Sequence, residues 1–197
     1  RKAENEKNRA AREKELGHKV PDELDAGAEQ AIRSNEAHIM HQDHETGFIH
    51  SPDGKQVWAN QGGVDYVDVS DARDKGVLRG NVLTHNHPQG NSFSHQDVNG
   101  LLAWGLKEMR AVSSKHLHRI QPPEHWPEHP TQAELDNMAS QIKHIEEGIR
   151  SEFWDRIGNG KMTKEEAAAQ HFHELWTRAA KEIGFKYSRE EHGGKLE

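Results

Sequence analysis

The chain has 197 residues, a formal net charge of −7 at neutral pH and a mean hydropathy of −1.05. This polarity favours one compact domain with solvated extensions over a core that runs the whole length. No apolar stretch reaches the roughly 18 residues of a membrane span, and no signal-peptide pattern opens the chain. The acidic balance argues against a nucleic-acid partner, and the lack of cysteine excludes thiolate metal sites and cysteine nucleophiles.

The N-terminal part is predicted to pass from helix into a meander of strands. Residues 1–16 are helix formers with almost no apolar face, so residues 1–20 are interpreted as a charged helical linker or tail of a longer polypeptide. A second helix is predicted over residues 21–33, and a strand over residues 36–43, where the apolar spacing changes. Further strands are expected at residues 48–50, 57–58 and 64–69, and a helical turn at residues 71–75.

Residues 82–97 carry the densest group of reactive side chains. A short apolar run predicts a buried strand at residues 82–84, and alternation along that strand puts His85 and His87 on one face. A turn with proline and glycine follows, and Asp97 falls in the first turn of a helix predicted over residues 96–106. Two imidazoles and one carboxylate leave a fourth tetrahedral position open, which is the arrangement of a catalytic zinc site.

The order His-x-His-Pro, a glycine-containing turn and Ser-x-x-Asp resembles the JAMM (MPN-plus) metalloprotease signature and its RadC-type version, His-Asn-His-Pro-x-Gly. The resemblance implies that His85, His87 and Asp97 are the ligands of a Zn²⁺ ion. It also implies that Ser94 steadies the oxyanion of the reaction. Six residues separate His87 from Ser94, one fewer than the usual family spacing.

A zinc hydrolase also needs a general base, which is usually a carboxylate within hydrogen-bond reach of the attacking water. The resemblance implies a glutamate near the start of the first core strand. Glu36 lies where the predicted helix gives way to a strand and fits that placement. Glu45, in a predicted hairpin turn, is the alternative.

The C-terminal part changes character after two more predicted strands, at residues 109–112 and 116–120. A proline-rich connector spans residues 122–130, and capping boxes at Thr131 and Thr163 open two long helices. We therefore expect a metal-binding core over residues 21–121 and a helical hairpin within residues 122–197 that packs on it. The fold class is α+β, with a mixed sheet flanked by helices, and the resemblance implies a JAMM-like, deaminase-like sandwich.

The leading hypothesis is a zinc-dependent peptidase or isopeptidase that acts on a protein or peptide. The motif is also similar to domains of phage head-morphogenesis proteins and polymorphic toxins, which implies a cytoplasmic, virion-associated or delivered effector domain. The alternatives are a metal-dependent nuclease, a DNA-associated RadC-like protein and a non-catalytic binding module. An intact ligand set argues against the binding module.

Overall fold

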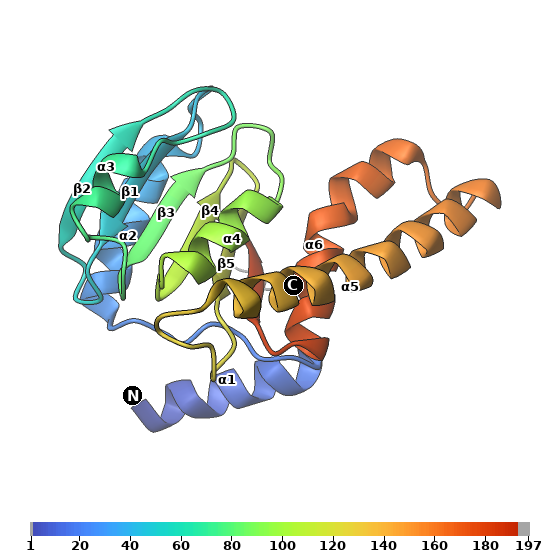
Figure 1. Ribbon diagram of the computed structural model, residues 1–197, viewed down its shortest axis with the longest axis horizontal. Coiled ribbons are helices and arrows are strands. Elements are labelled where there is room, and N and C mark those ends of the chain that lie inside the picture. The colour runs from blue at the N-terminus through green and yellow to red at the C-terminus, as the bar shows by residue number, and fades with distance from the viewer. Residues whose placement is uncertain (1, 193–197) are drawn as a thin grey trace.

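The computed structural model describes residues 2–192 and contains a six-stranded mixed sheet flanked by helices (Figure 1). The strands lie in the order β2-β1-β3-β4-β5-β6, with β3 and β4 parallel and all other neighbours antiparallel. The expected α+β class is confirmed. The strands are β1 (Thr46–His50), β2 (Gln56–Gln61), β3 (Val82–Asn86), β4 (Glu108–Val112), β5 (His116–Gln121) and β6 (Lys186–Glu191).

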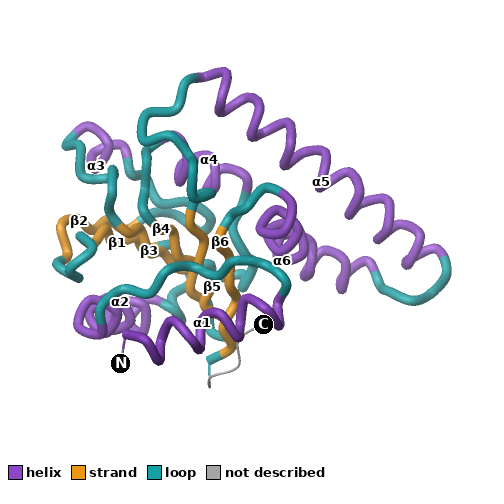
Figure 2. The backbone as a smooth tube through the Cα atoms, turned by 90° about the horizontal axis from the view of Figure 1, so that it is seen from below, coloured by secondary structure: helices purple, strands orange, loops and turns teal. Residues whose placement is uncertain are grey.

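The helices form a layer on each face of the sheet. Figure 2 shows α1 and α2 on one side of the strands and α4, α5 and α6 on the other. The pair α5 and α6 projects well beyond the sheet (Figure 1). In the described part of the chain, no helix is long and apolar enough to cross a membrane. The helices are α1 (Lys2–Leu16), α2 (Ala26–Ile39), α3 (Ser70–Asp74), α4 (His95–Ala103), α5 (Gln132–Gly158) and α6 (Lys164–Glu182).

The main core lies between the sheet and the α4, α5 and α6 layer. Leu101 of α4, Ile149 of α5 and Trp176 of α6 are all fully buried in it. A smaller cluster, which includes Ile39 and Val112, lies under α2 on the other face. Both faces of the central strands are therefore covered, which is why all five residues of β3 and all five of β4 are buried.

The unit β3–α4–β4 places the candidate site. Two parallel strands need a crossover, and α4 supplies it between the end of β3 and the start of β4. The first turn of α4 therefore comes back to the C-terminal end of β3, where His85 lies. Ligands commonly bind at this end of parallel strands because loops and helix N-termini converge there.

The strand expected over residues 36–43 is absent, because α2 continues to Ile39. Its buried residues are Ala28, Ile32, Glu36 and Ile39, which recur at helical spacing and give α2 one continuous inner face. This correction changes the placement of Glu36, which lies within a helix and not at the start of a strand.

The strand expected over residues 64–69 is also absent, and these residues form an irregular loop. Directly after β2, the amide of Gly63 donates to the carbonyl oxygen of Tyr66 at 2.9 Å, which folds the chain back on itself. A Cβ atom at the preceding residue, Gly62, would overlap the backbone carbonyl group of Tyr66, so the tight turn requires glycine there. The loop therefore stays beside β2 instead of adding a strand.

The sheet does not end at residue 121. The strand β6, which the sequence analysis did not predict, pairs along the whole of β5 from Gln121↔Lys186 to His116↔Glu191. The helix pair α5 and α6 is thus a long excursion between two neighbouring strands. The C-terminal segment completes the sheet as well as covering it.

Candidate metal centre

His85 and His87 reach the site from the end of β3. His85 is 4% exposed, and its side chain lies on the sheet face that α4 covers. His87 follows the strand, and its Nδ1 donates to the carbonyl oxygen of Asn91 at 2.9 Å. A carbonyl can only accept, so the Nδ1 atom of His87 carries the proton and its Nε2 presents a lone pair. This Nε2 lies 2.8 Å from the Nε2 of His85.

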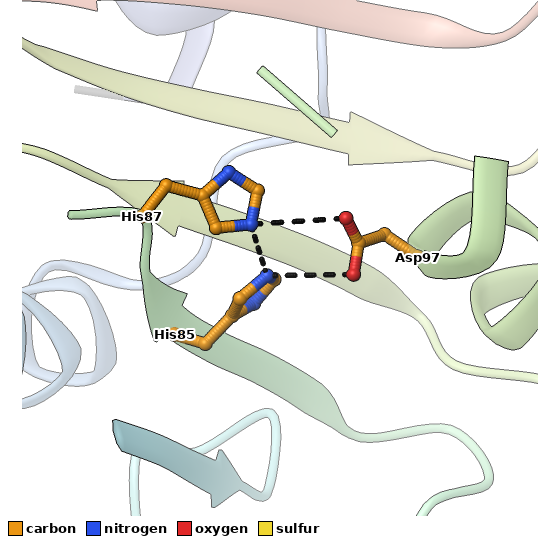
Figure 3. A group of neighbouring side chains, drawn as sticks. All are labelled: His85, His87 and Asp97. Carbon is orange, nitrogen blue, oxygen red and sulfur yellow. Dashed lines mark hydrogen bonds and ion pairs between the residues drawn. The ribbon is translucent and has the colours of Figure 1, made fainter. Parts of the chain in front are cut away.

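Asp97 brings the third ligand atom from the first turn of α4. Its backbone and side chain form a capping box with Ser94, in which the amide and hydroxyl of Ser94 both donate to Oδ2 at 2.7 Å. The Oδ1 atom lies 3.6 Å from His85 Nε2, and Oδ2 lies 3.7 Å from His87 Nε2 (Figure 3). The helix cap therefore orients the carboxylate toward both imidazoles.

The chemistry of these three groups fits a divalent cation. The three ligand atoms lie within 4.8 Å of one another, and this is the one such group among residues 2–192. Burial and the adjacent His87 imidazole lower the pKa of His85, which favours the neutral imidazole that binds metal. Burial opposes ionisation of Asp97, but the two histidines and the hydrogen bonds from Ser94 outweigh it and lower its pKa. Two imidazole nitrogens and one carboxylate oxygen suit Zn²⁺.

The cluster opens into a pocket of about 290 Å³, which also contains Glu45. Glu45 is 8% exposed, and its Oε1 lies 4.0 Å from His87 Nε2. Its backbone continues the β1–β2 ladder, because its amide donates to the carbonyl oxygen of Gly63 at 2.7 Å. Burial raises the pKa of Glu45 to about 8, and the charges of Asp97 and Asp65 add to the effect. Glu45 is therefore the carboxylate that the fold holds beside the ligand cluster.

The structure does not bring Glu36 to this pocket. Glu36 accepts a hydrogen bond from the Thr84 hydroxyl at 2.9 Å and lies 3.4 Å from a guanidinium nitrogen of Arg110. Thr84 precedes His85 on β3, and successive side chains of a strand point to opposite faces. Glu36 therefore lies across the sheet from the candidate metal ligands, in the layer of α2.

Ser94 lies in the pocket, but its hydroxyl already has partners. The Oγ atom donates to Asp97 Oδ2 at 2.7 Å and accepts from the Asp97 amide at 3.2 Å. In this structure Ser94 therefore caps α4 and holds Asp97.

Residues from the C-terminal segment also support the site, and the sequence analysis missed them. The indole of Trp176 donates to the carbonyl oxygen of Phe93 at 2.8 Å, and the hydroxyls of Ser92 and Tyr187 lie 3.1 Å apart. Both contacts anchor the loop between His87 and α4. They join residues more than 80 positions apart, so no local sequence pattern could reveal them.

The first of the three comparisons with known proteins, a search of family models, found no match to the chain. Searches of curated proteins and of solved structures found no match either.

Proposed function

We propose that this chain is a zinc-dependent hydrolase that cleaves a peptide or isopeptide bond. The observation that carries the proposal is the meeting of three metal-binding side chains, His85, His87 and Asp97, with the buried carboxyl group of Glu45 in one pocket. A structural zinc site would be closed by a fourth protein ligand, whereas this set leaves a position open. The resemblance of the motif to the JAMM signature supports the same three ligands.

Each residue has a distinct part in the proposed reaction. A zinc ion, when bound, would polarise the scissile carbonyl and lower the pKa of a water molecule. Glu45 then accepts the proton of the attacking water and passes it to the leaving amine. A nearby divalent cation lowers the pKa of a carboxyl group, so loading the site would shift Glu45 toward the ionised form that a base needs. Ser94 orients Asp97 through their hydrogen bond.

This assignment replaces Glu36 with Glu45 as the general base. A base must lie within hydrogen-bond reach of the proton it takes, or within one water of it. Glu45 lies 4.0 Å from a ligand nitrogen, whereas Glu36 binds Thr84 on the other side of β3. We assign Glu36 the structural role of pairing with Arg110.

The first experiment measures metal content by elemental analysis after reconstitution with zinc. The wild-type protein is expected to hold about one zinc per chain, and His85→Ala/His87→Ala to hold none. The matched control is His38→Ala/His41→Ala, which removes two exposed histidines and is expected to keep the metal. A wild-type protein that binds no zinc would overturn the proposal.

The second experiment compares hydrolysis of fluorogenic peptides and lysine-linked isopeptides by zinc-loaded variants. Glu45→Gln is expected to lose at least about 100-fold in rate with its zinc intact, because general base catalysis contributes about that much. Glu36→Gln is expected to keep its activity per folded molecule and to lose stability. If Glu36→Gln loses activity and Glu45→Gln keeps it, the general base is Glu36.

A further inference from the structure

A second hollow of about 330 Å³ lies between α4 and α5, and we call it the α4–α5 groove. Gln96 and Trp104 line both this groove and the metal pocket. Figure 1 shows the N-terminal part of α5 passing beside α4. The groove therefore adjoins the proposed active site through two shared side chains.

The lining of the groove suits a peptide backbone. Asn99 of α4 and Gln132 of α5 carry amides, which both donate and accept hydrogen bonds as a peptide unit does. Gln132 Nε2 donates one of its hydrogens to Asp136 Oδ1 at 2.8 Å, and the Asp136 carboxylate, which also lines the groove, can accept from a peptide N–H. Ala103 and Ala139 have short side chains, so a neighbouring backbone can approach both helices closely. Leu135 adds an apolar surface for a side chain of the occupant. A buried cofactor would need a more enclosed site.

Trp104 forms the junction between the pocket and the groove. Its ring lies so close to Gly100 that a Cβ atom there would meet ring carbons at 2.5 Å and 2.9 Å. Glycine at this position therefore lets the indole pack against the α4 backbone. The indole keeps its place on α4 and presents an aromatic surface to both hollows.

We propose that the α4–α5 groove is a binding subsite for an extended peptide segment of the substrate, whose scissile bond lies in the metal pocket. The inference rests on the proposed function and defines its substrate as an unfolded segment or tail. The nine residues of α4 span about 13 Å, at about 1.5 Å per residue. An extended peptide rises about 3.3 Å per residue, so about four residues would lie along the helix.

The test uses zinc-loaded protein and two pools of randomised, end-blocked peptides, one of tetrapeptides and one of decapeptides. Released amines give the initial rate, and mass spectrometry gives the cleavage positions. We expect the decapeptides to be cleaved at least tenfold faster, with about four residues or more retained on one side of the cut. Ala139→Trp, which fills the groove, is expected to lower the decapeptide rate about tenfold. The control Ser140→Trp, on the next exposed position of α5, is expected to match the wild type.

A second readout separates the subsite from the reaction. The side-chain amide signals of Asn99 and Gln132 are followed by NMR while decapeptides are added to Glu45→Gln. Chemical-shift changes that occur in Glu45→Gln and are absent in the double variant Glu45→Gln/Ala139→Trp support the subsite. This result supports the subsite even if the wild-type protein cleaves neither peptide pool and the proposed function is wrong. If both pools are cleaved at equal rates and Ala139→Trp does not change the decapeptide rate, the subsite proposal is wrong and the proposed hydrolase function still stands. An absence of amide shifts would also overturn the subsite.

Discussion

Glu108→Gln is expected to remove a large acid-sensitive part of the stability of this protein. Glu108 is fully buried at the start of β4. One carboxylate oxygen accepts from Arg110 at 2.6 Å and from Arg119 at 2.8 Å, and the other accepts from Gln121 at 2.7 Å. Burial opposes its ionisation, but the charges of Arg119 and Arg110 and these hydrogen bonds outweigh it. Together they lower the pKa of Glu108 to about 2.

The magnitude follows from linkage between protonation and folding. In the unfolded chain the pKa of Glu108 is about 4.5, and in the folded protein it is about 2. At about 1.4 kcal/mol per pH unit, this difference stabilises the folded state by about 3 kcal/mol. Because the folded pKa is the lower one, the stabilisation is complete above pH 4.5. It is lost as the pH falls toward 2.

The assay is urea unfolding of the metal-free protein from pH 7 to pH 2. The free energy of unfolding of the wild-type protein should exceed that of Glu108→Gln by about 3 kcal/mol at neutral pH. This difference should disappear as the pH falls from about 4.5 to about 2. Burial also lowers the pKa of His50 to about 4 and that of His173 to about 3, so both proteins lose stability below pH 6.5. Because the wild-type protein and Glu108→Gln share these histidines, that loss does not affect the difference between their free energies of unfolding. Glu124→Gln, at an exposed position, should follow the wild type. A gap that stays constant across the pH range would refute the reasoning.

Three further changes test the surroundings of the metal centre. Glu45→Gln should stabilise the metal-free protein in urea unfolding, and the gain in the free energy of unfolding should grow as the pH rises from about 4.5 toward 8. The reason is that the pKa of Glu45 is raised to about 8 in the folded protein, so its carboxyl group ionises more easily in the unfolded chain. Trp176→Phe should cost about 2–3 kcal/mol through a cavity and the lost bond to Phe93, and should weaken zinc binding in a chelator competition. Tyr187→Phe should cost about 1–3 kcal/mol in thermal unfolding, because its hydroxyl contacts three polar groups; stability equal to the wild type would contradict its role.

The meeting of His85, His87 and Asp97 could be predicted because the features that bring them together are local. A strand end presents His85, and the next turn returns the chain to the first turn of a helix within about a dozen residues. The step from Ser94 to Asp97 is both a helix cap and the means of orienting a carboxylate, so one short pattern specifies structure and geometry together. The start of α4 at His95 confirms the predicted helix.

The position of Glu45 could not be predicted because it depends on strand pairing. Glu45 directly precedes β1, and Gly47, two residues further along the chain, lies opposite His85 in the antiparallel pair of β1 and β3. This register brings Glu45 to the end of the sheet where the candidate metal ligands lie, and it depends on contacts far apart in the sequence. The change in apolar spacing predicts a strand from residue 36, whereas in the structure Ile32, Glu36 and Ile39 continue the inner face of α2. Glu36 therefore lies in the helix layer and not at the start of a strand.

The proposed site belongs to the whole fold rather than to residues 21–121 alone. The loop that carries Ser94 is anchored by Trp176 of α6 and by Tyr187 of β6, and Phe172 of α6 lines the pocket. A catalytic group must be held to within a fraction of an ångström, and a loop needs fixed partners to achieve that. These partners come from the helix pair and the sixth strand. The C-terminal segment therefore holds the loop of the candidate metal centre in place and also supplies the α5 side of the α4–α5 groove.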